Sequence, residues 1–293
     1  MDHTISNGQL SVSLTSAGGS LTSIRANGRE YLWQGDPAVW SGQAPICFPV
    51  CGGLRDGKAT TESGAQVSLA RHGFARKQEF ELVATGDAEA TYRLTSTPEL
   101  LAQYPFPFVF EARYRLDGTA LEVTYATTNT GTEPMPFFVG GHPAFRVPMD
   151  EGETYGDYEV RFTKPETHTV PTPEVDTGLI DVTHRNPAPQ VDGGYALPIS
   201  HELFAVAETI YDELDSRVVE LAHKSGSHGV RLSFPELPYL VVWSKPAADF
   251  VAVEPWGGLS TCSDEDDVLE HKRGCLVAQP GQTIERTFTV EPF

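Results

Sequence analysis

The stretch FVFEARYRLDGTALEVTYATTN, residues 108–129, decides the fold class of this 293-residue chain. Apolar side chains occupy every second position from Phe108 to Leu116, with mostly charged ones between them. A period of two is typical of a strand with one buried face. Asp117 and Gly118 interrupt the pattern, and this dipeptide favours the tight hairpin turns that need positive φ. We therefore predict two antiparallel strands joined by a short turn.

The same signals recur along the chain. Asn27 and Gly28 separate two alternating runs within residues 18–35, which predicts another hairpin. Further strands are expected at residues 90–97, 229–234, 239–246, 249–255 and 282–293. Short helices are expected at residues 97–105, 198–208 and 263–274, the last with Ser263 as N-cap and Gly274 past its basic end. Many strands without long helices predict an all-β fold, a sandwich of large antiparallel sheets in a single domain, residues 1–293.

Composition excludes several classes of function. Lys and Arg total 21 against 40 Asp and Glu, and the formal charge of -19 disfavours nucleic acid as a partner. The N-terminal residues lack a signal-peptide pattern, and no run approaches the roughly 18 apolar residues of a membrane span, so we expect a cytoplasmic protein without a membrane partner. Four dispersed cysteines, Cys47, Cys51, Cys262 and Cys275, are expected to be unpaired structural thiols.

Four short segments carry polar residues that strands do not need. They are FPVCGGLRDG (48–57), RHGFARKQEF (71–80), GGHPAF (140–145) and VAVEPWGGLS (251–260). Each combines an ionisable residue with Gly or Pro, which suits close backbone approach to a ligand and a fixed side-chain direction. A single His beside a Gly is more typical of an ordinary loop or core position, so the set of segments points to a site and no single one does.

Glu254 and His142 are the strongest candidates for acid–base chemistry. Glu254 follows the apolar run DFVAV and precedes Pro255 and Trp256, so we expect a desolvated carboxyl with a raised pKa that can act as general base near neutral pH. The alternative is a buried structural Glu held by an arginine. His142 ends its own apolar run, and a histidine near its ordinary pKa donates a proton at pH 7.

Taken in order, FPVCGGLRDG, HGFAR, GGHPAF and VEPWGG resemble the aldose 1-epimerase (galactose mutarotase-like) superfamily. The resemblance is closest to its LacX-like branch, with the hexose-6-phosphate epimerases as near relatives, and it runs from about residue 8 to residue 290. It implies a β-supersandwich that interconverts the α and β anomers of an aldohexose or hexose phosphate without a metal or other cofactor. The partner is then a small sugar or sugar phosphate, and we expect a monomer or homodimer.

The resemblance also assigns roles to residues of this sequence. Glu254 would take the proton from the C1 hydroxyl, and His142 would protonate the ring oxygen and open the ring. The glycines before His142 would let a sugar approach the backbone. Contacts with the sugar or its phosphate would come from His72, Arg55, Arg76 and Trp256, with Trp40, Tyr104 and Phe145 as further candidate walls.

One departure from the family leaves alternatives open. The family has a sugar-binding Asp in the segment that here reads HELFAVAETIYDEL, where Ala207 aligns and Glu208 or Asp212 is the candidate substitute. A non-catalytic carbohydrate-binding protein or sugar sensor is therefore the second hypothesis. A metal enzyme with His72, His142 and Glu254 as ligands lacks a His-x-His spacing. A glycosidase would need a second convincing carboxylate.

Overall fold

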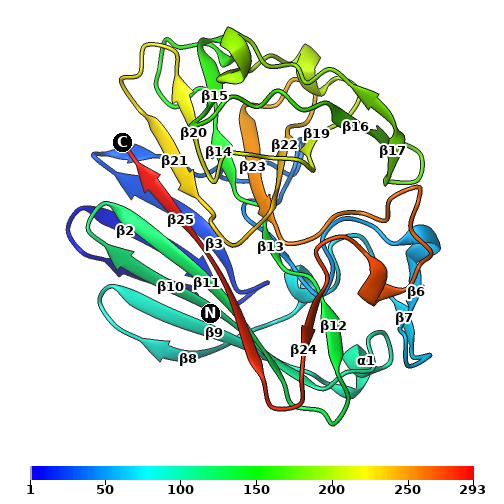
Figure 1. Cartoon of the computed structure of the whole chain (residues 1–293). Coiled ribbons are helices and arrows are strands. Elements are labelled where there is room, and N and C mark those ends of the chain that lie inside the picture. The colour runs from blue at the N-terminus through cyan, green and yellow to red at the C-terminus, as the bar shows by residue number, and fades with distance from the viewer. Residues whose placement is uncertain (1) are drawn as a thin grey trace.

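A computed structural model describes residues 2–293, and its largest element is a nine-stranded antiparallel sheet. The strand order is β18 (Ala196–Pro198), β15 (Tyr158–Phe162), β20 (Val218–His223), β21 (Gly229–Ser233), β25 (Thr283–Pro292), β11 (Ala120–Asn129), β10 (Phe108–Asp117), β9 (Glu89–Thr95) and β8 (Glu81–Thr85). In Figure 1 the sheet runs from β15 and β20 at the top, through the long β25 in red, to β8 and β9 near the bottom.

A second sheet packs against the first. It has the order β19 (Thr209–Tyr211), β22 (Tyr239–Trp243), β23 (Phe250–Trp256), β13 (Gly140–Gly141) and β5 (Ile46–Cys47), and β14 (Ala144–Arg146) also pairs with β23. The ring of Phe48, which follows β5, stacks on Phe110 of β10 with 4.5 Å between centroids. The all-β sandwich expected from the sequence is confirmed.

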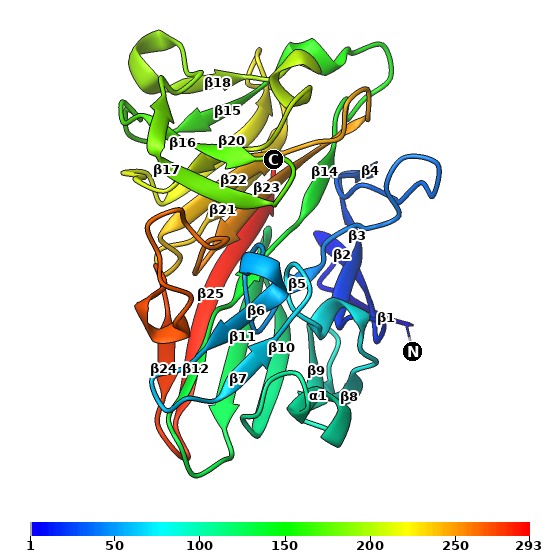
Figure 2. The same cartoon turned by 90° about the vertical axis from the view of Figure 1, so that its right-hand side faces the viewer.

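Smaller elements surround the two sheets. A four-stranded sheet comprises β1 (Asp2–Ser6), β2 (Leu10–Thr15), β3 (Ser20–Ala26) and β4 (Arg29–Glu30). Three two-stranded sheets pair β6 (Lys58–Thr60) with β7 (Gln66–Ser68), β12 (Met135–Phe137) with β24 (Leu276–Ala278), and β16 (Val170–Glu174) with β17 (Leu179–Asn186). Figure 2 places β1 to β4 on the right of the molecule and the β16–β17 hairpin on the upper left.

The predicted hairpins are present, with one difference in the turn. Asn27 and Gly28 both have positive φ, 53° and 79°, between paired Ala26 and Arg29, as a two-residue hairpin turn requires. In the 108–129 hairpin, Asp117 pairs with Ala120, so the turn residues are Gly118 and Thr119. Gly118, at φ 59°, supplies the positive φ there.

Helical structure is shorter than the sequence predicted. One turn of α-helix, α1 (Pro98–Leu101), begins after the N-cap Thr97, whose Oγ1 accepts the amide of Leu100 at 3.4 Å. Single 3₁₀ turns are η1 (Arg55–Gly57), η2 (Ala75–Lys77), η3 (Tyr155–Asp157), η4 (Asp192–Gly194), η5 (Glu202–Phe204) and η6 (Leu269–His271). The predicted helix over 198–208 reduces to η5.

The helix predicted over residues 263–274 is wrong. The segment is a loop that contains η6, because Glu265 turns inward instead of lining a helix surface. Its carboxylate accepts the backbone amides of Cys262 and Arg273, both at 2.9 Å. These bonds hold the chain in a tight loop and take the place of helical hydrogen bonds.

Buried apolar residues from both large sheets and from the four-stranded sheet belong to one hydrophobic cluster. That the residues form a single domain, 1–293, stays a prediction. The four cysteines are free thiols, as expected, with Cys275 half-buried and the other three buried. Among residues 2–293, the helices are all too short or too polar to cross a bilayer.

Candidate active site

Glu254 reaches a cleft because of the register of β23. Successive side chains of a strand point to opposite faces of the sheet. Val251 and Val253 therefore join the main core, while Ala252, Glu254 and Trp256 share the other face. Across the strand pair, Glu254 lies beside Val241 of β22. The short apolar run before Glu254 thus delivers its carboxyl into a nearly dry site.

His142 is brought to the same face from the neighbouring strand. Gly140 of β13 pairs with Trp256, and the chain then passes through His142 and Pro143 into β14. The carbonyl of Pro143 accepts the amide of Val253 at 3.1 Å, which fixes the chain beside β23. His142 is 7% exposed and Glu254 is 1% exposed.

The two glycines before His142 serve packing, contrary to the expectation that they admit a sugar to the backbone. A Cβ on Gly140 would lie 3.0 Å from Sγ of Cys51 and from Cδ1 of Trp256. A Cβ on Gly141 would lie 2.8 Å from the ring of Phe288 on β25. Both glycines therefore let β13 pack closely between the two sheets.

The cleft has a volume of about 300 Å³, at the lower end of the range for small-molecule sites. It is lined by Trp40, Arg71, His72, Arg76, His142, Glu208, Val241, Trp243, Glu254 and Trp256. Four polar atoms on these residues are buried and have no hydrogen-bond partner in the described part of the chain: His142 Nδ1, Glu254 Oε2, Trp256 Nε1 and Arg76 Nε. Unpaired buried polar atoms are costly, so their concentration in one cleft is typical of a polar ligand site.

The acid–base candidates lie side by side. His142 Nε2 is 3.1 Å from Glu254 Oε2, although off the line that a hydrogen bond requires. Burial raises the pKa of Glu254 well above its ordinary value, helped by nearby Cys47 and Glu208 and opposed by Arg71. The pKa of His142 is lowered to about 3, mainly by burial and with smaller contributions from the charges of Arg71 and Arg76.

These shifts confirm the expected direction for Glu254 and correct the expectation for His142. A histidine with a pKa of about 3 is neutral at pH 7, whereas the sequence predicted an ordinary pKa. Burial favours the uncharged form of both groups, a neutral imidazole and a protonated carboxyl. Between the two pKa values the pair therefore carries one proton, which resides on Glu254.

His72 closes the cleft on the other side of His142. Its ring lies 5.5 Å from that of His142 and 5.3 Å from that of Trp256, between centroids. Nδ1 accepts the amide of Gly52 at 3.2 Å, and Nε of Arg71 lies 3.2 Å from Nε2. Burial, followed by His142 and the two arginines, holds the pKa of His72 well below its usual value. His72 is therefore a neutral ring.

The backbone at His72 is held in an uncommon conformation. Its φ is 64°, in the left-handed region that non-glycine residues rarely adopt. Its amide donates to Gly52 O at 2.7 Å, and its carbonyl accepts the amide of Phe48 at 3.2 Å. The next residue has to be glycine, because a Cβ on Gly73 would lie 2.2 Å from Phe48 O.

Three lining residues were missed by the sequence analysis: Arg71, Val241 and Trp243. Arg71 stands directly before His72, and this adjacency was the available signal. Trp243 ends the apolar strand β22, where nothing local distinguishes it from a core residue. Glu208, one of two candidates for the missing family Asp, lies in the cleft with its Oε1 3.0 Å from Nη2 of Arg71.

Other candidates lie elsewhere. Arg55 pairs with Asp267, with both carboxylate oxygens 3.1 Å from its Nε, and does not line the cleft. Asp212 accepts two hydrogen bonds from Arg185, each 2.8 Å long. Among the proposed aromatic walls, Trp40 and Trp256 line the cleft, whereas Tyr104 and Phe145 are fully buried in the core.

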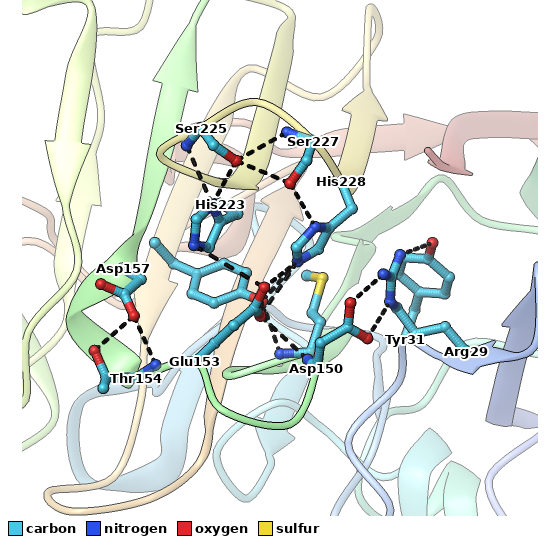
Figure 3. Close-up of polar contacts among 12 residues, drawn as sticks. Arg29, Tyr31, Asp150, Glu153, Thr154, Asp157, His223, Ser225, Ser227 and His228 are labelled. Atoms are coloured by element: carbon cyan, nitrogen blue, oxygen red, sulfur yellow. Dashed lines mark hydrogen bonds and ion pairs between the residues drawn. The ribbon is translucent and has the colours of Figure 1, made fainter.

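A second ionisable cluster lies away from the cleft, where β4 and the ends of β20 and β21 meet the segment after β14 (Figure 3). The ligand atoms of Asp150, Glu153 and His228 lie within 4.8 Å of one another. Arg29 already donates twice to Asp150, and Tyr158 donates to Glu153. The cluster thus fits a satisfied structural network better than a cation site. In the described part of the chain, His72, His142 and Glu254 do not gather ligand atoms as closely.

Comparison with known proteins places the chain in a family. The sequence model of the aldose 1-epimerase family matches residues 1–288. The plasmid-encoded protein LacX of Lactococcus lactis subsp. lactis is 36% identical over 98% of this chain and 97% of its own length. A galactose mutarotase related enzyme from Lactobacillus acidophilus superposes with a TM-score of 0.92 at 30% identity, covering 100% of this chain and 97% of that one.

A second solved structure agrees. A galactose mutarotase-like protein from Lactobacillus casei ATCC 334 has a TM-score of 0.88 at 27% identity, with both chains covered completely. The fold is therefore the galactose mutarotase-like sandwich. With the family match over nearly its whole length, this chain belongs to the aldose 1-epimerase family.

Proposed function

We propose that this protein is an aldose 1-epimerase that interconverts the α and β anomers of an aldohexose or hexose phosphate. The observation that carries the proposal is the contact of His142 with Glu254, 3.1 Å apart in a cleft of monosaccharide size. The reaction opens a cyclic hemiacetal, which needs one proton removed from the C1 hydroxyl and one delivered to the ring oxygen. A pair of groups that carries one proton supplies both functions.

The reaction begins with the proton of the pair. Its transfer from Glu254 to His142 over the 3.1 Å contact gives a carboxylate and an imidazolium, which the sugar hydroxyls help to solvate. The carboxylate then takes the C1 hydroxyl proton while the imidazolium protonates the ring oxygen. The bond from C1 to the ring oxygen breaks and the open-chain aldehyde forms.

Rotation about C1–C2 presents the other face of the aldehyde. The reverse proton transfers then close the ring as the opposite anomer and return the pair to its starting state. Positioned acid and base groups typically contribute about 10² to 10⁴ in rate.

The other lining residues would hold the sugar. His72, Arg76 and Glu208 offer donors and acceptors for hydroxyl groups, and Arg76 could also meet a phosphate. Trp40 and Trp243 lie edge to face, 5.3 Å between centroids, with the ring of His142 within 5.7 Å of both. Such rings suit the apolar face of a sugar.

A second candidate function is sugar binding without catalysis. It is favoured by the low pKa of His142, because the imidazolium that protonates the ring oxygen is not populated in the empty cleft at pH 7. Under this alternative the same cleft binds a sugar with saturable affinity and leaves its anomers unchanged.

Anomer exchange measured by NMR separates the two. Fresh α-glucose, α-galactose and their 6-phosphates are each mixed with the protein, and the approach to anomeric equilibrium is compared with that in buffer alone. Acceleration that is lost in Glu254→Gln and in His142→Asn supports the epimerase. Calorimetric binding without acceleration across the panel supports the binding protein.

A further inference from the structure

Two residues that line the cleft, Arg71 and Glu208, form an ion pair that has no part in the proposed reaction. Arg71 and Glu208 approach to 3.0 Å, with side chains 42% and 18% exposed. Arg71 comes from the loop before His72, and Glu208 directly precedes β19 at the edge of the second sheet. The pair thus joins two sides of the cleft that are 137 positions apart in sequence.

The pair occupies the face of Arg71 that would otherwise bind an anion. A guanidinium holds phosphate best through two parallel N–H bonds from one edge. Here Nη2 of Arg71 donates to Glu208, and Nε lies 3.2 Å from Nε2 of His72. Nη1 lies against the backbone of Gly178, where a Cβ would be 2.7 Å away. The two nitrogens with printed contacts, Nε and Nη2, are therefore both engaged by the protein.

Arg76 is similarly engaged. Its Nη2 donates to the carbonyl of Arg71 at 2.9 Å, and its Nε is buried without a partner. The cleft therefore contains two cations that are both restrained by protein contacts. Glu208 adds a negative charge to the lining of the cleft, and the whole chain carries a net charge of -19.

Glu208 itself remains available to an uncharged ligand. Only Oε1 bonds to Arg71, and in the described part of the chain Oε2 has no hydrogen bond. A carboxylate oxygen accepts from sugar hydroxyls but repels a phosphate dianion.

We infer that Glu208, held by its ion pair with Arg71, is a specificity-determining residue that makes the cleft discriminate against phosphorylated sugars. The inference rests on the proposed function for its kinetic readout. Its binding readout does not require turnover.

The test compares Glu208→Gln with Glu202→Gln, a matched control. Glu202 is exposed in η5, six positions earlier, and the control removes the same charge outside the cleft. Glucose and glucose 6-phosphate are titrated by calorimetry into each variant and into the unaltered protein at low ionic strength. NMR exchange gives kcat/KM for both sugars.

The unaltered protein and Glu202→Gln are expected to favour glucose by at least about tenfold. In Glu208→Gln this preference should fall by about tenfold, since the competing carboxylate is gone and Arg71 is free to bind phosphate. Added salt should weaken the newly gained phosphate binding. Glu208→Asp, which keeps the charge, should retain most of the preference.

A preference for glucose 6-phosphate in the unaltered protein would overturn the inference, as would an unchanged ratio in Glu208→Gln. If both sugars bind without anomer exchange, the proposed function falls, and the calorimetric ratio still decides the role of Glu208. If neither sugar binds, both the proposed function and the inference about Glu208 are wrong.

Discussion

Nε2 of His142 and Oε2 of Glu254 lie 3.1 Å apart, on side chains that are only 9% and 1% exposed. In so dry a position a free carboxylate and a free imidazolium are each costly, which is why both pKa values move toward the neutral forms. Between the two pKa values the pair carries one proton, on Glu254, beside the neutral ring of His142. This relationship supports the proposed acid–base reaction, in which the cleft takes up no net proton.

Removing either member should therefore abolish most of the activity. We expect Glu254→Gln and His142→Asn each to lower kcat by about 10² to 10⁴. The double variant should be little worse than the more damaging single one, because groups that act as a unit show non-additive effects. Polarimetry of fresh α-glucose gives the rates, and circular dichroism checks the fold. Two single variants whose losses multiply in the double variant would contradict joint action of the pair.

His142 should also make the fold sensitive to acid. Its pKa falls from 6.5 in the unfolded chain to about 3 in the native state, so the unfolded chain takes up a proton that the native state does not. This contribution to stability is complete above pH 6.5 and is lost as the pH falls toward 3. Each pKa unit corresponds to roughly 1.4 kcal/mol.

Urea unfolding at pH 7, 5 and 4 measures the effect. The unaltered protein should lose stability more steeply than His142→Asn across this range. His201→Asn, which alters an exposed histidine, is the control and should follow the unaltered protein. Parallel curves for all three proteins would show that His142 does not titrate as its burial implies.

The sequence predicts the fold well because its signals are local. Alternation in residues 108–129 and the turn residues at Asn27 and Gly28 depend only on near neighbours, and the strands form as expected. The prediction of a helix over 263–274 fails because Glu265 turns inward, where its carboxylate forms a buried ion pair with Lys272. Helix caps alone could not reveal that contact.

The candidate site was predictable in part for the same reason. His142 and Glu254 each end an apolar run, so both could be expected near a buried surface. That His142 is neutral follows from its burial in the folded protein and from two arginines, which no local pattern encodes. Arg55 was chosen for its segment, yet its partner Asp267 is 212 positions away.

Arg55 and Arg76 form a matched pair for testing whether Arg76 contacts the sugar and Arg55 does not. Arg55→Gln should leave KM and kcat unchanged, since Arg55 does not line the cleft. Its loss of stability should be at most about 1 kcal/mol, because the ion pair with Asp267 is over one-third exposed. Arg76→Gln removes a lining cation and should raise KM for the sugar severalfold. If the two variants raise KM equally, Arg55 contributes to sugar binding and the assignment of Arg76 alone is wrong.

The loop that replaces the predicted helix depends on a buried ion pair. Lys272 Nζ lies 2.8 Å from Oε2 of Glu265 and donates to Oγ1 of Thr261 at 3.0 Å, with the charged side chains 2% and 4% exposed. Lys272→Met should cost at most about 3 to 5 kcal/mol, because it removes the buried partner of Glu265 and leaves that carboxylate only Arg273, whose Nη1 lies 3.3 Å from Oε1. Urea unfolding measures the loss.

Two further variants test the cause. Lys245→Met, at an exposed lysine, should change stability by less than about 0.5 kcal/mol. The double variant Lys272→Met, Glu265→Gln should recover part of the loss, since it removes the stranded charge while an amide oxygen can still accept the amide of Cys262. If the double variant is less stable than Lys272→Met alone, the loop is held by the carboxylate's bonds to the backbone and not by its charge pairing with Lys272.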